Sequence, residues 1–286
     1  MKTSIIQRQT KEYLNYCEFV RNMSPQTIRS KKWLLLRHFS QECCVSDLQE
    51  LDNSHINKWI AKQIARGVSG RTVNGRLSHI KAMIKYHRDM GLKISVKLPL
   101  IVKVKELPPR QVFFTRAQIH KALKYANDLE WLLIRICFDT GMRLGELTYL
   151  KLENVSGCEL RYIGKGRKAR RSFICQDTRD RLEAYCIKYE IQDYLWKSPM
   201  RWDGLPYSLE EIRRLMKRPF EYAGLKGFYP HALRHSFGTD IQRNGASIPE
   251  AQKLLGHSKY ETTERYLHNL DNRLGELFAK YKKAVV

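Results

Sequence analysis

The sequence is most informative at residues 229–239, which read Tyr229-Pro230-His231-Ala232-Leu233-Arg234-His235-Ser236-Phe237-Gly238-Thr239. Pro230 is typical of a first helical turn, where its missing backbone N–H costs no hydrogen bond. If this run is helical, His231 and Arg234 leave the same face, because they are three residues apart. A guanidinium can grip two phosphate oxygens, and an imidazole can exchange a proton near neutral pH. The pair therefore predicts a phosphate-binding helix, whereas a lone His-x-x-Arg pair elsewhere is usually an ordinary surface feature.

A second histidine and a tyrosine follow this helix in two short stretches. Residues 254–258 read as a helix end with a glycine behind it, and residues 262–268 lie at the end of the next short helix. His-x-x-Arg, then His257, then Tyr266 resembles the C-terminal signature of the tyrosine recombinases, the integrase family. Tyr260 is nearer to His257, but it lies in the first helical turn beside the cap. Tyr266 is therefore the expected nucleophile, and Tyr260 is the next candidate.

The charge balance favours a polyanionic partner. The chain has 286 residues, 43% of them hydrophobic, with 52 basic and 29 acidic side chains and a net charge of +23. Surfaces that serve only solubility usually mix the two signs, so an excess of this size favours nucleic acid. Residues 1–107 hold 20 basic and 8 acidic side chains, which is +12, and the rest of the chain holds +11. Both halves are therefore expected to contact the same DNA.

No segment predicts a membrane span or a disulfide framework. The sequence has no apolar run of about 18 residues, and its first residues lack the apolar core of a signal peptide. The seven cysteines are odd in number and show no C-x-x-C spacing. We therefore expect free thiols in a cytoplasmic protein without a membrane partner.

The first hundred residues predict a helical domain. Helices are expected at about 10–21, from Ser24-Pro25 to Phe39, at 54–66 and from Arg71 to Met90, with Gly91 ending the last one. This block resembles the core-binding domain of the recombinases, which favours DNA contact over a merely solvated polar face on the last helix. The residues of that face are Arg71, Asn74, Arg76 and Lys81.

A proline-bearing stretch separates two predicted domains. Residues 93–110 show no helical period, alternate valine with lysine within 101–105 and include Pro108-Pro109, so they read as a boundary. The expected division is a helical, SAM-like core-binding domain at 1–106, a linker at 107–112 and a catalytic domain at 113–286. The fold class is mainly α with a small β-hairpin, arranged as a two-domain DNA clamp.

The catalytic domain carries the remaining motifs. A capping box at Thr115 opens one helix, residues 131–138 form an apolar helix, and Gly141 ends it. Arg143 and Glu146 then lie three apart on one helix edge, either as a surface ion pair of little energy or as a phosphate-binding arginine steadied by a carboxylate. Gly-x-Arg-x-x-Glu-Leu is also the first box of the tyrosine recombinases.

Residues 159–174 predict a β-hairpin with a basic, glycine-rich turn. A basic turn by itself is a generic DNA contact, and Lys168 and Arg170 are expected to bind DNA in that way. The turn also resembles the recombinase hairpin that carries the catalytic lysine. On that resemblance Lys165 is the expected lysine, and Lys168 is the alternative.

The resemblance implies the roles of these residues. Arg143, Arg234 and His257 would stabilise the scissile phosphate, Lys165 would protonate the leaving oxygen, and His231 would be the base toward Tyr266. The products would be a 3′-phosphotyrosine and a free 5′ hydroxyl, formed without metal, cofactor or ATP. Strand exchange would take place between specific double-stranded DNA sites held by a tetramer. Apolar residues recur at helical spacing from Leu270 to Tyr281. By spacing alone they would dock equally well on a neighbouring subunit or on their own domain, and the resemblance favours the neighbouring subunit.

Three other functions share parts of this pattern. A type IB topoisomerase would use the same chemistry while relaxing DNA as a monomer, but the helical N-terminal block and the short tail argue against it. A catalytically inactive DNA-binding protein would not need all the boxes, and a metal-dependent nuclease would need a carboxylate cluster. The sequence does not separate integration of a mobile element from excision, inversion or dimer resolution, and it does not reveal the DNA site.

Overall fold

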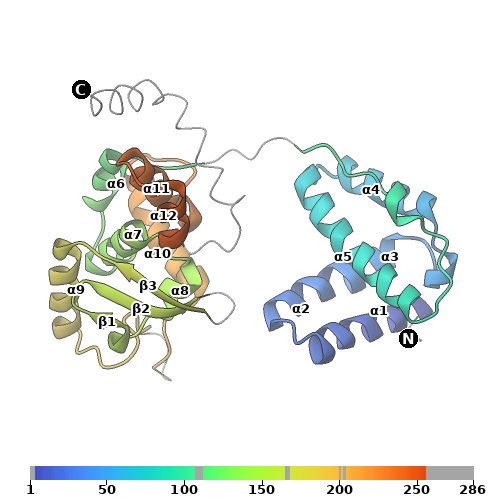
Figure 1. Ribbon diagram of the computed structural model, residues 1–286, viewed down its shortest axis with the longest axis horizontal. Coiled ribbons are helices and arrows are strands. Elements are labelled where there is room, and N and C mark those ends of the chain that lie inside the picture. Colours follow the sequence, from blue (N-terminus) through green and yellow to red (C-terminus); the bar gives the residue numbers. More distant parts are fainter. Residues whose placement is uncertain (1–3, 107–111, 165–167, 200, 202–203, 256–286) are drawn as a thin grey trace, which may run out of the picture. The chain divides into compact units, whose positions relative to one another are not determined.

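The computed structural model describes residues 4–106, 112–164, 168–199, 201 and 204–255. The chain divides into two compact units, Met1–Pro109 and Arg110–Val286, each with its own hydrophobic core (Figure 1). Within the described part, no helix combines the length and apolar character needed to cross a bilayer.

The N-terminal unit is a helical block, as the sequence predicted. The first helix begins earlier than predicted, at Ile5 instead of about Thr10, and two helices continue into π-helical turns. The elements are α1 (Ile5–Asn15), a π segment (Tyr16–Val20), α2 (Pro25–Lys32), a second π segment (Trp33–Phe39), α3 (Ser40–Glu42), a 3₁₀ turn (Leu48–Glu50), α4 (Asn53–Ala65), α5 (Gly70–Asp89) and a 3₁₀ turn (Leu98–Leu100).

Local capping chemistry explains where these helices begin and end. The Ser24 hydroxyl accepts the backbone N–H of Thr27, and Pro25 occupies the first turn of α2. Gly91 has a φ of +91°, a left-handed conformation that glycine adopts without steric cost, so the chain turns away directly after α5.

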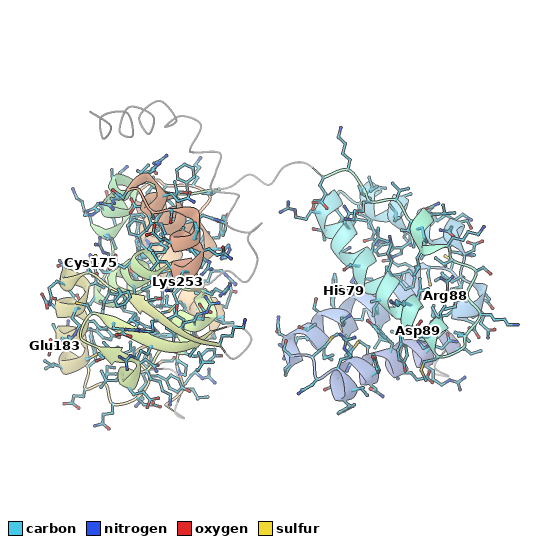
Figure 2. The ribbon with its side chains drawn as sticks, viewed as in Figure 1. His79, Arg88, Asp89, Cys175, Glu183 and Lys253 are labelled. Carbon is cyan, nitrogen blue, oxygen red and sulfur yellow. The ribbon has the colours of Figure 1, made fainter. Side chains whose placement is uncertain are left out.

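The segment that the sequence marked as the start of a linker belongs to the N-terminal core. Ile94, Val96 and Ile101 are buried in that core, and Arg88 donates to the carbonyl of Ile94 at 2.5 Å and to that of Val96 (Figure 2). The boundary read from the whole stretch 93–110 was therefore too wide on its N-terminal side, because Ile94, Val96 and Ile101 belong to the N-terminal core. Side chains of α5 bind the backbone of Ile101 and Val104, whereas the side chain of Val102 is exposed.

The C-terminal unit packs helices around a small sheet. A capping box at Thr115 opens α6, as predicted, and another at Ser208 opens α10. The helices and turns are α6 (Arg116–Leu123), α7 (Asp128–Thr140), α8 (Leu144–Thr148), a 3₁₀ turn (Leu152–Asn154), α9 (Gln176–Lys188), α10 (Leu209–Tyr222), α11 (Pro230–Arg243) and α12 (Ile248–Leu255). The apolar helix α7 lies in the core, in contact with α11, α9 and α10.

The predicted hairpin is present as part of a three-stranded antiparallel sheet. Its strands β1 (Val155–Ser156), β2 (Glu159–Gly164) and β3 (Lys168–Phe173) are neighbours in that order. Tyr162 pairs with Arg170, and Gly164 pairs with Lys168 at the end of the ladder. Arg170 therefore lies two residue pairs before the last pair of the ladder.

Candidate active site

Gly141 lies at the centre of the candidate site, where α7 ends close to α11 and α12. It ends α7 with a φ of +62°, and a Cβ at this position would collide with the ring of Phe237 on α11 and lie 2.9 Å from Leu255 Cδ2 on α12. Only glycine allows this close approach together with this backbone conformation. The start of the Arg143 motif is therefore held against α11 and α12, which Figure 1 draws side by side.

Arg143 is the residue directly before α8, and the carboxylate of Glu146 holds it in place. Glu146 Oε2 accepts the backbone N–H of Arg143 at 2.9 Å, and Oε1 accepts the guanidinium at 3.1 Å. The Glu146 side chain is 7% exposed and that of Arg143 is 30% exposed. The pair is therefore more than a surface ion pair: the carboxylate is shielded, and the guanidinium still reaches solvent.

Arg234 is one of the largest fully buried side chains in the described structure, at 2% exposure. Its guanidinium donates to the carbonyl of Gly141 at 2.5 Å and to that of Leu255, also at 2.5 Å. An arginine has five N–H donors in a rigid plane, so two carbonyls fix the orientation of that plane. Arg234 thus joins α11 to the end of α7 and to the end of α12.

His231 is the second residue of the same helix and is exposed, one turn from the buried Arg234. Its ring lies edge-on to that of His235, with 4.9 Å between centroids and 83° between planes. The helix that the sequence predicted for this stretch is therefore present. It presents an imidazole to solvent while it anchors the arginine inside.

Arg170 connects the hairpin to the same centre. Its Nη1 donates to the Leu255 carbonyl at 3.0 Å, and its Nε lies 3.9 Å from Glu146 Oε1. Its side chain is 14% exposed, and it lies where a Cβ on Gly164 would collide with it. The sequence predicted a DNA contact for Arg170, whereas the structure shows it packed among catalytic-domain residues.

A cavity of about 450 Å³ opens beside Arg143 and Glu146. Gly164, the last described residue before the hairpin tip, lines it together with Tyr149 and Tyr162. Burial raises the pKa of the Tyr162 phenol, which also hydrogen-bonds Ser172, with 3.0 Å between the oxygens. The Tyr162 side chain is therefore uncharged at neutral pH where it lines this cavity.

Two family models match the sequence and together cover nearly all of the chain. The model described as Phage integrase family matches residues 113–273, which is more than half of the chain, and the one described as Phage integrase, N-terminal SAM-like domain matches residues 10–91. The chain belongs to the phage integrase family of tyrosine recombinases.

Curated relatives of this phage integrase family member are named tyrosine recombinases. Tyrosine recombinase XerC of Lactobacillus delbrueckii subsp. bulgaricus is 29% identical over 90% of this chain and 92% of its own length. Tyrosine recombinase XerD of Staphylococcus aureus is 25% identical over 94% of this chain and 97% of its own.

Solved structures share the fold. XerH recombinase bound to a palindromic difH substrate matches with a TM-score of 0.74 and 21% identity, over 96% of this chain and 85% of that one. A lambda integrase dimer bound to a COC′ core site matches with a TM-score of 0.75 and 15% identity, over 89% and 96%.

Several predicted site residues lie outside the described residues. They are Lys165, His257 and Tyr266, together with the alternative nucleophile Tyr260 and the tail at 271–286. The structure does describe the residues that precede two of them, because Gly164 ends β2 directly before Lys165, and Leu255 ends α12 two residues before His257. Lys168, the alternative lysine, is exposed at the start of β3.

The four DNA-binding residues predicted on α5 have partners within their own unit. Asn74 donates to the Val104 carbonyl at 2.8 Å and accepts the Val104 N–H at 2.9 Å, and Lys81 donates to the Ile101 carbonyl at 3.0 Å. Arg71 pairs with Glu106 at 3.3 Å, and Arg76 lies over the Trp33 ring, 5.3 Å from its centroid. Asn74 and Lys81 thus hold the 101–106 segment, a role that the sequence analysis missed because the partners are remote in sequence.

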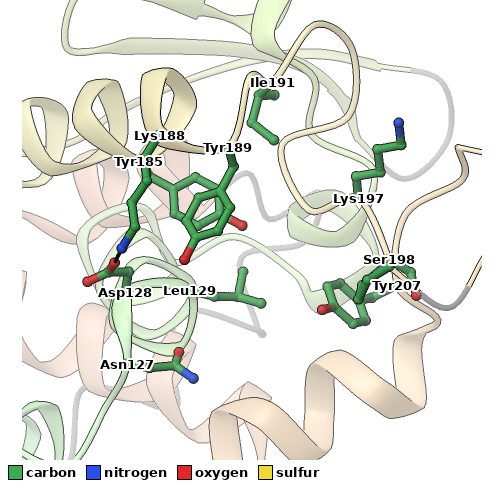
Figure 3. A pocket seen from close by; sticks show the side chains of 11 residues that line it. Asn127, Asp128, Leu129, Tyr185, Lys188, Tyr189, Ile191, Lys197, Ser198 and Tyr207 are labelled. Carbon is green, nitrogen blue, oxygen red and sulfur yellow. Dashed lines mark hydrogen bonds and ion pairs between the residues drawn. The ribbon is translucent and has the colours of Figure 1, made fainter.

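Another cavity, of about 630 Å³, lies between the start of α7 and the end of α9 (Figure 3). Tyr185, Tyr189 and Tyr207 line it, and Lys188 donates to Asp128 at 2.7 Å across its edge. Among the described residues, no predicted site residue lines this cavity, whereas Arg143 and Glu146 line the other one.

Proposed function

We propose that this protein is a site-specific DNA recombinase that cleaves and rejoins strands through a covalent bond between Tyr266 and a 3′ phosphate. One observation supports this proposal most strongly. Arg234 donates to the Gly141 carbonyl, and Arg143 follows Gly141 by two residues. The turn at Gly141 therefore brings together two motifs that are distant in the sequence, each with its arginine. Paired guanidiniums suit a phosphate whose oxygens gain negative charge in the transition state.

In the proposed step, the Tyr266 oxygen attacks phosphorus and the bond from phosphorus to the 5′ oxygen breaks. His231 takes the phenol proton, which is needed because the ordinary tyrosine pKa is about 10. Lys165 gives a proton to the leaving 5′ oxygen, while Arg143, Arg234 and His257 stabilise the non-bridging oxygens. The phosphodiester energy stays in the protein–DNA bond, so attack by another 5′ hydroxyl reverses the step without ATP.

Both units take part in the proposed function. The core-binding domain at 1–106, the linker at 107–112 and the catalytic domain at 113–286 would clamp a specific double-stranded site. Four protomers would assemble on two such sites, because exchange of both strands between two duplexes requires four cleavages. Arg71 and Lys168 are the proposed DNA contacts that remain exposed.

A nicked suicide substrate tests this function. Cleavage next to the nick releases a short fragment, so the covalent complex accumulates and survives denaturation. We expect this adduct to form equally well in EDTA, since arginine, lysine and histidine side chains supply the charge and the protons. Strict dependence of the chemical step on Mg²⁺ would contradict the proposal. Relaxation of supercoiled DNA by the monomer without recombinant product would support the type IB topoisomerase alternative.

A further inference from the structure

Arg170 lies where three parts of the catalytic unit meet. It extends from β3 past Gly164 of β2, reaches Glu146 of α8 and donates to the carbonyl at the end of α12. Each of these parts either contacts a residue of the proposed mechanism or lies directly before one in the sequence. Glu146 holds Arg143, Gly164 precedes Lys165, and Leu255 is followed by Gly256 and His257.

Two partners of Arg170 each also bind a second arginine. Leu255 accepts Arg170 at 3.0 Å and Arg234 at 2.5 Å, so both guanidiniums approach one carbonyl at a helix C-terminus, where the helix dipole is negative. Glu146 Oε1 accepts Arg143 at 3.1 Å and lies 3.9 Å from Arg170 Nε. Arg170 therefore completes a continuous connection from Arg143 to Arg234.

This connection is shielded from water, so the attraction between its charged side chains is strong. The side chains of Glu146 and Arg170 are 7% and 14% exposed, so water screens their attraction poorly. A carboxylate between two guanidiniums is held more firmly than one with a single partner, since either partner limits its rotation. Glu146 in turn determines the direction of the Arg143 guanidinium.

We propose that Arg170 is a positioning residue that orients Arg143, through Glu146, and Arg234, through the Leu255 carbonyl, toward the scissile phosphate. This inference rests on the proposed function. It assigns to Arg170 a role in the rate of cleavage instead of the DNA contact predicted from the sequence.

The test compares Arg170→Met with the matched control Arg171→Met in the full chain. Arg171 is the next residue of β3, its side chain is 66% exposed, and it pairs with Glu159 away from the site. We expect Arg170→Met to bind DNA with unchanged affinity and salt dependence, yet to cleave a suicide substrate about 10–100-fold more slowly, the effect of a small misplacement of reacting groups. Arg171→Met should cleave at the wild-type rate.

A methylphosphonate substrate provides a readout that a purely structural role would not change. Its scissile phosphate carries a methyl group in place of one charged oxygen, so it needs less charge stabilisation from the two arginines. The defect of Arg170→Met should therefore shrink on this substrate, and Arg170→Lys should show an intermediate defect on the ordinary one. If Arg170→Met does not fold, Arg170→Lys is compared on the same two substrates.

Three outcomes would overturn the inference. Wild-type cleavage by Arg170→Met would remove the positioning role, and an equal defect on both substrates would leave only a structural one. Weaker binding with a salt slope reduced by about 0.9, the value of one lost phosphate contact, would make Arg170 a DNA ligand. Failure of the proposed function is distinguishable from all three, since the wild-type protein would then form no adduct.

Discussion

Glu146 holds Arg143 at two points, because one carboxylate oxygen accepts the backbone N–H at 2.9 Å and the other accepts the guanidinium at 3.1 Å. The same side chain therefore fixes both the start of α8 and the direction of the arginine. Such pre-organisation lowers the cost of ordering a charged group during the reaction.

Glu146→Gln should slow cleavage while DNA binding is retained. A neutral amide keeps the size of the side chain but loses the charge that attracts Arg143, so we expect a decrease of about 10–100-fold in the single-turnover rate. Glu183→Gln is the control, since Glu183 pairs with Arg179 on the surface of α9 (Figure 2). Equal rates for Glu146→Gln and wild type would show that the carboxylate does not position Arg143.

Two glycines of α5 should respond in opposite ways to alanine. A Cβ at Gly70 would collide with the Lys105 carbonyl and lie 3.1 Å from Val104, so Gly70→Ala should destabilise the N-terminal unit by about 1–3 kcal/mol. A Cβ at Gly75 meets nothing within 4 Å, so Gly75→Ala should stabilise the helix by about 0.5–1 kcal/mol. Urea unfolding measures both. A neutral Gly70→Ala would mean that residues 104–105 are not packed on α5.

The N-terminal unit should lose stability in mild acid. Burial lowers the pKa of His87, although its hydrogen bond to the Gln9 carbonyl, at 2.9 Å, favours the charged form. The unfolded chain then takes up a proton first, so stability present above the ordinary histidine pKa of about 6.5 decreases as the pH falls below it. Hydrogen exchange in α5 measures this change. His87→Gln, which can still donate to Gln9, should show a smaller loss, and an identical loss would exclude His87 as the cause.

Deletion of residues 271–286 should separate cleavage from recombination. The apolar side predicted for this tail suits docking on a neighbouring subunit, as the family resemblance implies. The shortened protein should still bind one site and form the adduct, but it should assemble few tetramers on native gels and yield little recombinant. Normal recombination would exclude exchange of the tail between subunits. Unfolding of the catalytic unit would assign the tail to its own domain.

Elements that depend on local chemistry could be predicted from the sequence. The helix starts at Ser24 and Thr115 follow from side chains that cap the backbone N–H group three residues ahead. The left-handed glycine after α7 and the Arg143–Glu146 pair are equally local.

Features that join distant segments could not be predicted in this way. The alternating valines and lysines of residues 101–105 read as a linker because nothing nearby reveals that Asn74 binds their backbone. Arg170 resembled a DNA contact for the same reason, since its partners Glu146 and Leu255 come from other elements. The roles of Lys165, His257 and Tyr266 remain predictions from the motifs.

The covalent adduct of Tyr266 tests the proposed chemistry most directly. Wild type, Tyr266→Phe and Tyr260→Phe are each incubated with the nicked suicide substrate, and the denaturation-resistant complex is measured beside DNA binding. We predict adduct for wild type and Tyr260→Phe, and none for Tyr266→Phe, which should bind DNA normally because only the phenol oxygen is lost. An adduct that persists in Tyr266→Phe would contradict the assignment of the nucleophile.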